Sequence, residues 1–400
     1  MRVAITGLGA ISAVGHSAIE HLDAIRTGRL GITRPLASAE RSGSPCAEVE
    51  GFEPDQHFSG NQLALMDRAS QFAVLAARQA VAQAGDVLDA GAPMRQGVLF
   101  SAALGYTTIE HAYRRMYGEG AARVHPLLVP RAMPSAPASQ IGMDLGIQGP
   151  TFNIATACAS ATHAIGAGFH MVRSGMLDVA VVGGCEAPLT LGFMRSWDAL
   201  RAVARDTCRP FSKDRSGLVM GEGGAALVLE RMDRALARGS TIFGEIVGFG
   251  MSADAGDITA PDPSGSARAM QAALADADLD ANSIGYVHAH GTGTILNDLN
   301  ETIALRSVLG ARVTSVPISS SKGAIGHTMC ASGALGLVFT TLALGNGLVP
   351  PTMNFTEGDP EIDVDCVPNA ARSASVEFAM INSFAFGGLN AVLITRSLQS

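Results

Sequence analysis

The stretch TACASATHAIGAG, residues 156–168, decides the fold when it is set beside a second stretch, GHTMCASGALGLV, residues 326–338. Both contain the tripeptide Cys-Ala-Ser, and both continue into a run of small residues with few charges. Such a run is typical of a helix that is buried on all sides. Each stretch also follows a strand-like run, TFNIAT or VPISSS. The repetition predicts a fold of two related halves with the two small-residue helices at its centre.

Short apolar runs alternate with helical patterns along the rest of the chain. The strand-like runs include RVAI, GVLFSA, DVAVVGG, AALVLE, IFGEIVGFG and IGYVHAH. This alternation predicts an α/β architecture whose sheets are covered on both faces. We expect the two halves, residues 1–238 and 239–400, to meet between Arg238 and Thr241.

Two helices have recognisable ends. One is expected from Gln62 to Ala84. The other is expected from about Asp298 to Leu309, because Asp298 and Glu301 have the spacing of a capping box. The stretch GLGAIS near the start lacks the third glycine of a dinucleotide loop, and we expect a tight turn there instead.

Composition excludes several classes of protein. Hydrophobic residues make up 47% of the 400 residues and charged ones 16%, so we expect an ordered globule. The net charge of −8 argues against nucleic-acid binding, which needs a basic field. The six cysteines form no Cys-x-x-Cys pair, which favours a reducing cytosol over a disulfide framework. The opening MRVAITGLGAIS enters a strand at once, so no signal peptide is expected.

The longest uncharged run, Ala331 to Pro351, is long enough to span a bilayer. It carries four glycines and two threonines, which favour a buried core helix. No membrane span is therefore expected.

Cys158 stands where an extended run ends and a buried helix is expected to begin. Unpaired N–H groups and the helix dipole at that position would favour its thiolate, and the helix carries no charge before Arg173. The alternative is a small packing residue, which is the commoner role of a free cysteine. Composition leaves both interpretations open.

Two histidines stand at strand ends beside glycine-rich loops, where α/β proteins often carry reactive groups. His290 precedes GTGT, and His327 follows Lys322 in SSSKGAIGHTM. His288 and His290 are expected on one face of a strand, so a metal site with His327 has to be considered. No carboxylate or cysteine accompanies them at a typical spacing, and we expect no metal.

Ordered blocks along nearly the whole chain resemble the β-ketoacyl synthases, the condensing enzymes of fatty-acid and polyketide assembly. The blocks are RVAITGLGAIS, ATACASA, RPFSKDRSGLVMGEGG, HAHGTGT, SSSKGAIGHTMCASG and NSFAFGGLN. The resemblance implies the thiolase fold, two α/β halves in a five-layered α-β-α-β-α sandwich. It also implies condensation of an acyl thioester with malonyl-acyl carrier protein (malonyl-ACP). No cofactor is implied beyond the phosphopantetheine arm of the carrier protein.

The resemblance assigns roles position by position. Cys158 resembles the nucleophile that takes the acyl chain as a thioester. His290 and His327 look like the pair that assists loss of CO2, and Lys322 resembles the lysine that shapes their electrostatics. Glu301 is similar to the family's acidic residue near that lysine, with the capping box as its structural alternative.

Further positions resemble the family's substrate contacts. Thr292 and Thr294 look like the hydroxyls that hold the phosphopantetheine arm. Phe386 resembles a gating phenylalanine whose backbone N–H completes an oxyanion hole with that of the nucleophile. Ala385 and Leu389 depart from the family's usual Gly and Thr, which leaves the gating and the acyl range open.

The resemblance also implies partners. An acidic carrier protein needs a local basic patch, for which there are six candidates: Arg68, Arg123, Arg131, Arg195, Arg201 and Arg205. A homodimer and a heterodimer with a ketosynthase-like chain-length factor both remain open, as do fatty-acid and polyketide pathways. A cytoplasmic location is expected.

Three other interpretations concern the cysteines. A thiolase would need another catalytic cysteine near the C-terminus, where the last one is Cys366 in DVDCVPN. A non-catalytic chain-length factor would lack the nucleophile, which is present here. Cys330, in the second Cys-Ala-Ser, comes a turn too late to act and is predicted to be a buried packing residue.

Overall fold

The apolar runs form ten strands of one hydrogen-bonded sheet in the computed structural model, which describes residues 1–33 and 43–398. Five strands come from the first part of the chain: β1 (Val3–Ser12), β3 (Gln96–Ser101), β4 (Thr151–Asn153), β5 (Val179–Glu186) and β7 (Gly223–Arg231). Five come from the second part: β8 (Gly244–Ala253), β9 (Ile284–His288), β10 (Ile318–Ser319), β13 (Phe378–Ala385) and β14 (Leu389–Arg396).

The sheet repeats one topology on either side of its centre. Outward from the central pair, the order β1-β7-β5-β3-β4 matches the order β8-β14-β13-β9-β10. In each set the second strand is antiparallel to both neighbours and the outer three strands are parallel. Antiparallel pairing of β1 with β8 joins the two sets. The repeat that two short stretches suggested therefore extends to the whole sheet.

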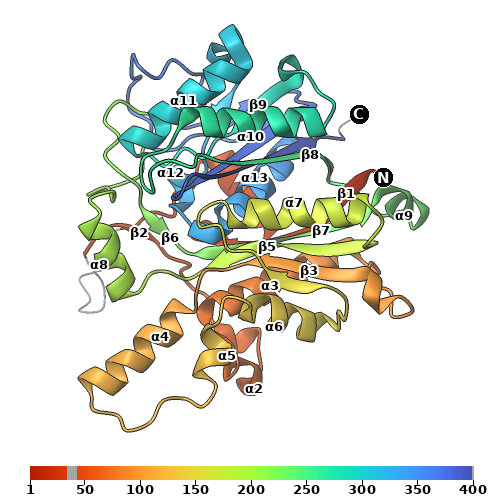
Figure 1. Ribbon diagram of the computed structural model, residues 1–400, viewed down its shortest axis with the longest axis vertical. Coiled ribbons are helices and arrows are strands. Elements are labelled where there is room, and N and C mark those ends of the chain that lie inside the picture. The colour runs from red at the N-terminus through yellow and green to blue at the C-terminus, as the bar shows by residue number, and fades with distance from the viewer. Residues whose placement is uncertain (34–42, 399–400) are drawn as a thin grey trace.

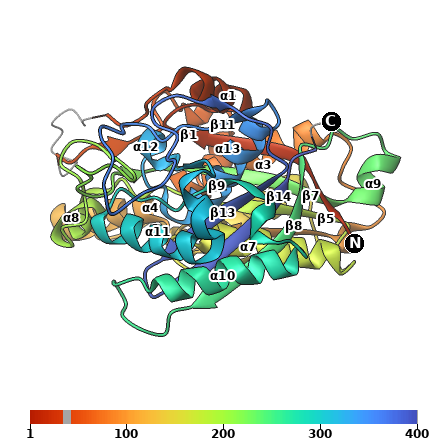
Figure 2. The ribbon, with the colours of Figure 1, turned by 90° about the horizontal axis from the view of Figure 1, so that it is seen from above.

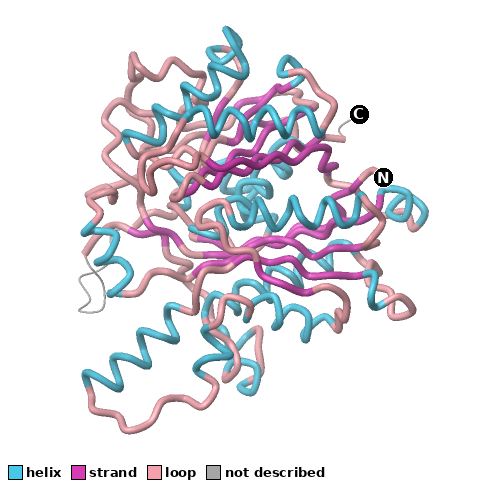
Figure 3. The backbone as a smooth tube through the Cα atoms, viewed as in Figure 1, coloured by secondary structure: helices cyan, strands magenta, loops and turns pink. Residues whose placement is uncertain are grey.

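Helices divide the sheet into two layers and cover both (Figure 1). The middle layer holds α7 (Ser160–Arg173) and α13 (Ser332–Leu344), which contact each other and both sets of strands. Outer helices are α3 (Arg68–Ala84) and α6 (Ala136–Leu145) on one side, and α10 (Pro263–Asp276) and α11 (Ile295–Leu309) on the other. The predicted five-layered α-β-α-β-α sandwich is confirmed, and Figure 3 shows the same layers by secondary structure.

Shorter elements complete the chain. In Figure 2, α1 lies at one edge of the molecule, and it packs on α13. The shorter helices are α1 (Ala18–Thr27), α2 (Gly60–Leu63), α4 (Tyr106–Tyr113), α5 (Leu128–Ala132), α8 (Leu191–Ala199), α9 (Met232–Ala237) and α12 (Lys322–Ile325). The short strands are β2 (Cys46–Ala47), β6 (Met220–Gly221), β11 (Leu348–Val349) and β12 (Arg372–Ser373).

Burial on all sides, predicted for both small-residue helices, holds for α13 but not for α7, in which nine of 14 residues are buried. All 13 residues of α13 are buried, because the helix lies between two sheet layers. The uncharged run that begins at Ala331 thus folds into a core helix that ends at Leu344, followed by β11. Within the described ranges, no helix has the length and apolarity needed to cross a membrane.

The stretch GLGAIS forms no tight turn, contrary to the prediction, because β1 runs through it to Ser12. Its glycines instead let α3 lie directly on the strand. A Cβ at Gly7 would lie 2.0 Å from the carbonyl oxygen of Ala80, and one at Gly9 would lie 1.9 Å from that of Ala76. Close helix–strand packing explains these glycines.

The helix expected from Gln62 to Ala84 is broken. α2 ends at Leu63, and α3 begins at Arg68. Asp67 causes the break, because its carboxylate accepts a hydrogen bond from the Ala69 N–H and caps α3.

The second predicted helix begins earlier than expected. α11 starts at Ile295, with Thr294 as its N-cap residue. Asp298 and Glu301 therefore lie inside the helix, and the predicted capping box does not form. Their buried carboxylates accept hydrogen bonds from backbone N–H groups outside the helix.

Candidate active site

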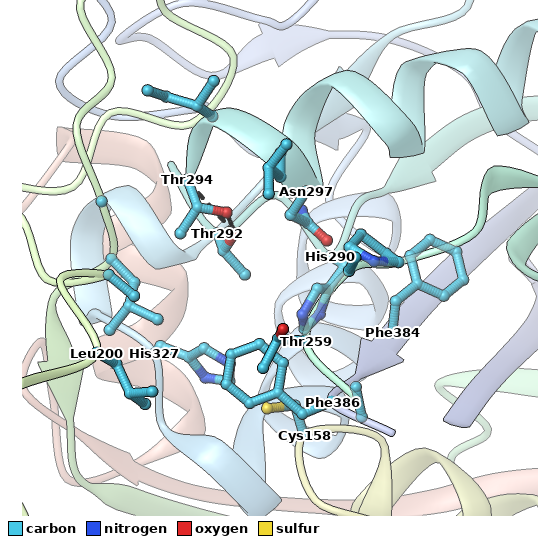
Figure 4. A pocket seen from close by; sticks show the side chains of 18 of the residues that line it. Cys158, Leu200, Thr259, His290, Thr292, Thr294, Asn297, His327, Phe384 and Phe386 are labelled. Atoms are coloured by element: carbon cyan, nitrogen blue, oxygen red, sulfur yellow. Dashed lines mark hydrogen bonds between the residues drawn. The ribbon is translucent and has the colours of Figure 1, made fainter. Parts of the chain in front are cut away.

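One cavity of about 460 Å³ collects most of the residues singled out from the sequence. Figure 4 shows the rings of His290 and His327 turned toward the same space as the sulfur of Cys158. Its wall includes the six predicted residues Cys158, His290, Thr292, Thr294, His327 and Phe386. These residues come from the turn before α7, the loop after β9, the loop after α12 and the β13–β14 turn.

Cys158 is held in a strained turn just before α7. The preceding Ala157 has a φ of 48°, a conformation that costs free energy in a residue with a Cβ. The Ser160 hydroxyl stabilises the turn by donating to the Ala157 carbonyl (2.6 Å) and accepting from the Thr156 N–H (2.7 Å). The turn thus fixes the position of the Cys158 side chain, which is 6% exposed.

The thiolate form of Cys158 is not favoured in this site. Burial raises the pKa of the Cys158 thiol to about 11, and the positive charge of Lys322 opposes this only in part. Desolvation therefore outweighs the electrostatic benefit expected at the helix terminus. Cys158 carries its proton at neutral pH, and the proton has to leave when the substrate reacts.

His327 has a defined tautomer. The Met329 N–H donates to its Nδ1 (3.0 Å), and the Ser332 hydroxyl lies 3.0 Å from the same atom. Because a backbone N–H can only donate, Nδ1 is the acceptor, and in the neutral ring the proton is on Nε2. Burial and the charge of Lys322 keep the pKa of His327 well below its ordinary value. The ring is a neutral N–H donor.

His290 lies beside His327, with ring centroids 5.5 Å apart and ring planes at 83°. Its other ring neighbour is Phe384, at 6.0 Å. Burial and the charge of Lys322 keep the pKa of His290 well below its ordinary value. In the described part of the chain, no group hydrogen-bonds to its buried Nδ1. Two neutral imidazoles therefore face one small space.

Lys322 and Glu301 hold the backbone of His290 from behind the cavity wall. The Lys322 ammonium donates to the His290 carbonyl. The Glu301 carboxylate accepts from the N–H groups of His290 and Gly291, both at 2.8 Å, and from the Asn382 side chain. Burial lowers the pKa of Lys322, while the negative charge of Glu301 opposes that shift. This pair is placed to position the histidine and to set its charge state.

Thr292 and Thr294 form a polar strip on the cavity wall. Their hydroxyl oxygens are 2.8 Å apart. Asp298 fixes this loop because its carboxylate accepts from the N–H of Gly293 (3.2 Å) and of Phe211 (2.8 Å). Asp298 therefore orders the loop that carries both threonines.

His288 points into the core. Its Nε2 lies 3.2 Å from the Ser321 hydroxyl, and its ring packs against Gly336 of α13 so closely that a Cβ there would lie 2.7 Å from Cε1. This position separates His288 from the two cavity histidines. Across residues 1–33 and 43–398, no group of three or more His, Cys, Asp or Glu is arranged to hold a metal ion.

Cys330 is buried, as predicted, with 2% of its surface exposed. Its carbonyl oxygen packs against β5, only 2.8 Å from where a Cβ on Gly184 would lie. Among the described cysteines, Cys158 alone lines the cavity. The two Cys-Ala-Ser copies therefore occupy different environments.

Sequence reasoning missed the loop that follows β8, which forms one side of the cavity. Its residues Asp254, Asp257, Ile258, Thr259, Ala260 and Pro261 line the wall together with Asn390. The Asp254 carboxylate accepts from the Asn390 side chain (2.7 Å) and from the Asp262 N–H (3.0 Å), tying the loop to β14. The stretch SADAGDITAPDP, rich in turn residues directly after a strand, was the available signal.

The six candidate arginines have different surroundings, and one of them, Arg131, donates to the Met66 carbonyl (3.2 Å). Arg201 lines the cavity, and Arg123, Arg195 and Arg205 are exposed. Arg68 instead binds the buried Glu222 carboxylate with two of its nitrogens, at 2.6 and 3.0 Å. Its position indicates a structural role.

Comparison with known proteins matches residues 1–235 to the model described as Beta-ketoacyl synthase, N-terminal domain, and residues 243–356 to Beta-ketoacyl synthase, C-terminal domain. The chain is 43% identical over 401 residues to Nodulation protein E of Rhizobium sp. (strain N33), with 99% of each chain covered.

Two further relatives cover the whole length of the chain. It is 37% identical over 410 residues to 3-oxoacyl-[acyl-carrier-protein] synthase 2 of Staphylococcus aureus (strain MRSA252), covering 100% of this chain and 99% of the relative. The solved structure of the ishigamide ketosynthase/chain length factor superposes with a TM-score of 0.93 at 35% identity, covering 100% of this chain and 99% of that one. The structural likeness confirms the predicted fold.

Proposed function

The chain belongs to the β-ketoacyl synthase family, and from that premise we propose that it is a 3-oxoacyl-ACP synthase. The reaction is decarboxylative condensation of an acyl group on Cys158 with malonyl-ACP, giving 3-oxoacyl-ACP and CO2. The observation that carries the proposal is one cavity with a single cysteine and two neutral histidines, His290 and His327, on its wall.

The first half-reaction loads the nucleophile. The Cys158 sulfur attacks the thioester carbonyl of an acyl-ACP, loses its proton, and expels the carrier thiol, which takes a proton. The tetrahedral intermediate carries an oxyanion, for which the backbone N–H groups of Cys158 and Phe386 are the proposed donors. Losing one such donor typically costs about 10²- to 10³-fold in rate.

The second half-reaction makes the carbon–carbon bond. Malonyl-ACP loses CO2, and the electron pair of that bond forms an enolate on the remaining thioester. The Nε2–H of His327 and the ring of His290 are placed to stabilise the enolate oxygen without a change in their charge. The enolate carbon then attacks the acyl thioester, and the departing Cys158 sulfur takes a proton. Lys322 and Glu301 act by positioning His290.

Other residues on or near the cavity wall are the proposed contacts of the phosphopantetheine arm and of the carrier protein. Thr292 and Thr294 are the proposed contacts of the phosphopantetheine arm, because both line the cavity and their hydroxyl oxygens lie 2.8 Å apart. Arg201 at the cavity wall and the exposed Arg195 and Arg205 are the proposed contacts of the acidic carrier protein. The proposed chemistry calls on no metal and no cofactor other than that arm.

The partner chain and the pathway belong to the same proposal. The ishigamide ketosynthase/chain length factor supports a catalytic subunit of a heterodimer, and 3-oxoacyl-[acyl-carrier-protein] synthase 2 supports fatty-acid synthesis. Six free cysteines and the latter relative favour the cytoplasm. Size-exclusion separates the two assemblies, because an isolated chain that is a stable, active homodimer contradicts an obligate heterodimer.

We also propose that the chain divides into an N-terminal half, residues 1–238, with the nucleophile, and a C-terminal half, residues 239–400, with the histidines. The repeated strand order on either side of the β1–β8 pair supports this division. Thiolase chemistry has less support, since Cys366, which would have to be its second cysteine, is not on the cavity wall. A non-catalytic subunit is disfavoured by the presence of Cys158.

The test is incubation of the protein with acyl-ACP and malonyl-ACP, followed by mass spectrometry. A 3-oxo product two carbons longer is expected from the natural sequence and from Cys330→Ala, but not from Cys158→Ala. The proposal fails if no acyl donor gives product and Cys158 is never acylated, or if Cys158→Ala gives the same yield.

A further inference from the structure

The only tryptophan of the chain lies against the proposed gate. Trp197, in α8, is 6% exposed, and its indole stacks on the ring of Phe386 with centroids 5.7 Å apart and planes at 17°. Phe386 belongs to the β13–β14 turn and is 42% exposed. Both rings line the cavity that contains Cys158, and Figure 4 shows Phe386 at the same end of the cavity as Cys158. The tryptophan therefore covers one face of a ring that is otherwise largely free.

Further aromatic contacts hold Trp197 in place. Phe193, one turn earlier in α8, meets the indole at 69° and 6.3 Å, and Tyr106 of α4 lies 4.3 Å from Phe193. Four rings thus run in series from α4 to the β13–β14 turn. The Glu110 carboxylate also ties α4 to the first turn of α8, because it accepts from the N–H groups there at 2.8 and 2.7 Å.

The turn that carries Phe386 is the more adaptable side of the stack. Gly387 and Gly388 follow with φ values of 82° and 67°, in the region that glycine adopts without strain. Trp197 is fixed by a helix and by the buried Leu218 and Met220. A displacement of the stack therefore moves Phe386 and leaves Trp197 in place.

We propose that Trp197 is a positioning residue that latches Phe386 in the closed position until a long chain on Cys158 displaces it. Displacement by an acyl chain rests on the proposed acylation of Cys158, whereas the stacking of Trp197 on Phe386 is a feature of the structure. In this proposal a long chain on the sulfur takes the space beside Phe386, which lines the same cavity, and the ring then leaves the indole. The alternative hypothesis is that Trp197 only packs and does not control the position of Phe386.

The single tryptophan reports this movement directly. Cys158 is alkylated with dodecyl iodoacetamide at pH 9, mass spectrometry confirms the adduct, and indole emission is compared before and after. The emission maximum is expected to shift with the dodecyl reagent, but not with iodoacetamide and not in Cys158→Ala. Cys330→Ala is the matched control and should shift like the natural sequence.

Two outcomes of that experiment overturn the latch. One is complete dodecyl labelling of Cys158 with unchanged emission. The other is the same shift in Cys158→Ala, which would place its origin elsewhere. Alkylation needs neither a carrier protein nor condensation, so this result is independent of the proposed reaction.

Kinetics distinguish latching from packing. A stacked aromatic pair contributes a factor of about 2 to 10 in an equilibrium. Trp197→Leu should therefore speed dodecyl alkylation of Cys158 about 2- to 10-fold and leave the iodoacetamide rate unchanged. Trp197→Phe, which keeps an aromatic face, should stay close to the natural rate.

A double substitution completes the test. In a Phe386→Leu background, Trp197→Leu should have no further effect on dodecyl alkylation, because the stack is already absent. Equal acceleration of both reagents by Trp197→Leu, no acceleration of either, or additive effects of the two substitutions would each show that Trp197 only packs.

Discussion

Alkylation of Cys158 should rise steeply with pH, well beyond the range in which ordinary thiols have ionised. Burial raises the pKa of this thiol from 9.0 to about 11. Because the thiolate is the nucleophile, the fraction that reacts at pH 7.5 is about 0.03%, against about 3% for an unperturbed thiol. Labelling at pH 7.5 should therefore be about 100-fold slower than for an exposed cysteine and should rise about tenfold per pH unit up to pH 10.

The assay is timed labelling with iodoacetamide between pH 7 and 10, with the peptide that contains Cys158 quantified by mass spectrometry. Lys322→Met removes the positive charge that lowers the thiol pKa, so it should slow labelling at every pH in this range without flattening the slope. Cys330→Ala provides the control, because its Cys158 peptide should follow the same profile as the natural sequence.

A labelling rate that levels off between pH 7 and 8 would refute this reasoning. A plateau there would mean that Cys158 is a thiolate at neutral pH and that the helix terminus outweighs burial. Faster labelling in Lys322→Met would refute the sign of the lysine's effect.

Three further predictions concern single residues. Cys330→Ala should keep kcat/KM within about twofold, since the buried thiol interacts with Glu186 and Ser160 and does not line the cavity, and a tenfold loss would contradict this. Arg68→Met leaves the buried Glu222 carboxylate unpaired and should lower the free energy of unfolding by about 3 kcal/mol in urea titration; unchanged stability with weaker carrier binding would instead indicate a docking role. Glu301→Gln removes one of two acceptors behind His290 and should slow condensation roughly tenfold while Cys158 is still acylated, measured in separate half-reactions; loss of acylation as well would contradict a role confined to the histidine.

Local pattern predicted eight of the ten strands of the sheet and the two small-residue helices, because their signal lies in consecutive residues, but β13 and β14 were not predicted. It failed where a long-range contact decides the local structure. GLGAIS contains turn residues, yet it is a strand whose glycines make room for Ala76 and Ala80 of α3. Asp67 breaks a continuous helical pattern because it caps α3, and it also accepts the Thr108 N–H of α4.

The residues of the site also fall into those that the sequence could predict and those that it could not. Its reactive residues carry recognisable neighbours along the chain, so Cys158 and the histidines could be singled out. The wall contributed by the loop after β8 could not, because only folding brings Asp254 against Asn390. The protonation of Cys158 also could not be predicted, since it depends on burial competing with a helix terminus and Lys322.

The two Cys-Ala-Ser copies show how one local geometry supports two kinds of chemistry. Ala157 and Met329, the residues before each cysteine, have the same φ of 48°, so the strained turn itself is repeated. In the first copy the turn presents Cys158 to the cavity. In the second copy the cysteine does not line the cavity, and the Met329 N–H and the Ser332 hydroxyl bind Nδ1 of His327 instead.

The second turn therefore serves to bind His327 rather than to present a cysteine. The Met329 N–H points back at the histidine, and its hydrogen bond to Nδ1 fixes the tautomer that an N–H donor to an enolate requires. The first turn uses the same conformation to place a sulfur. The shared tripeptide alone could not show which cysteine is the nucleophile, because the feature that the two copies share is the backbone turn. The two copies differ in the side chain that lines the cavity, which is Cys158 in the first copy and His327 beside the second.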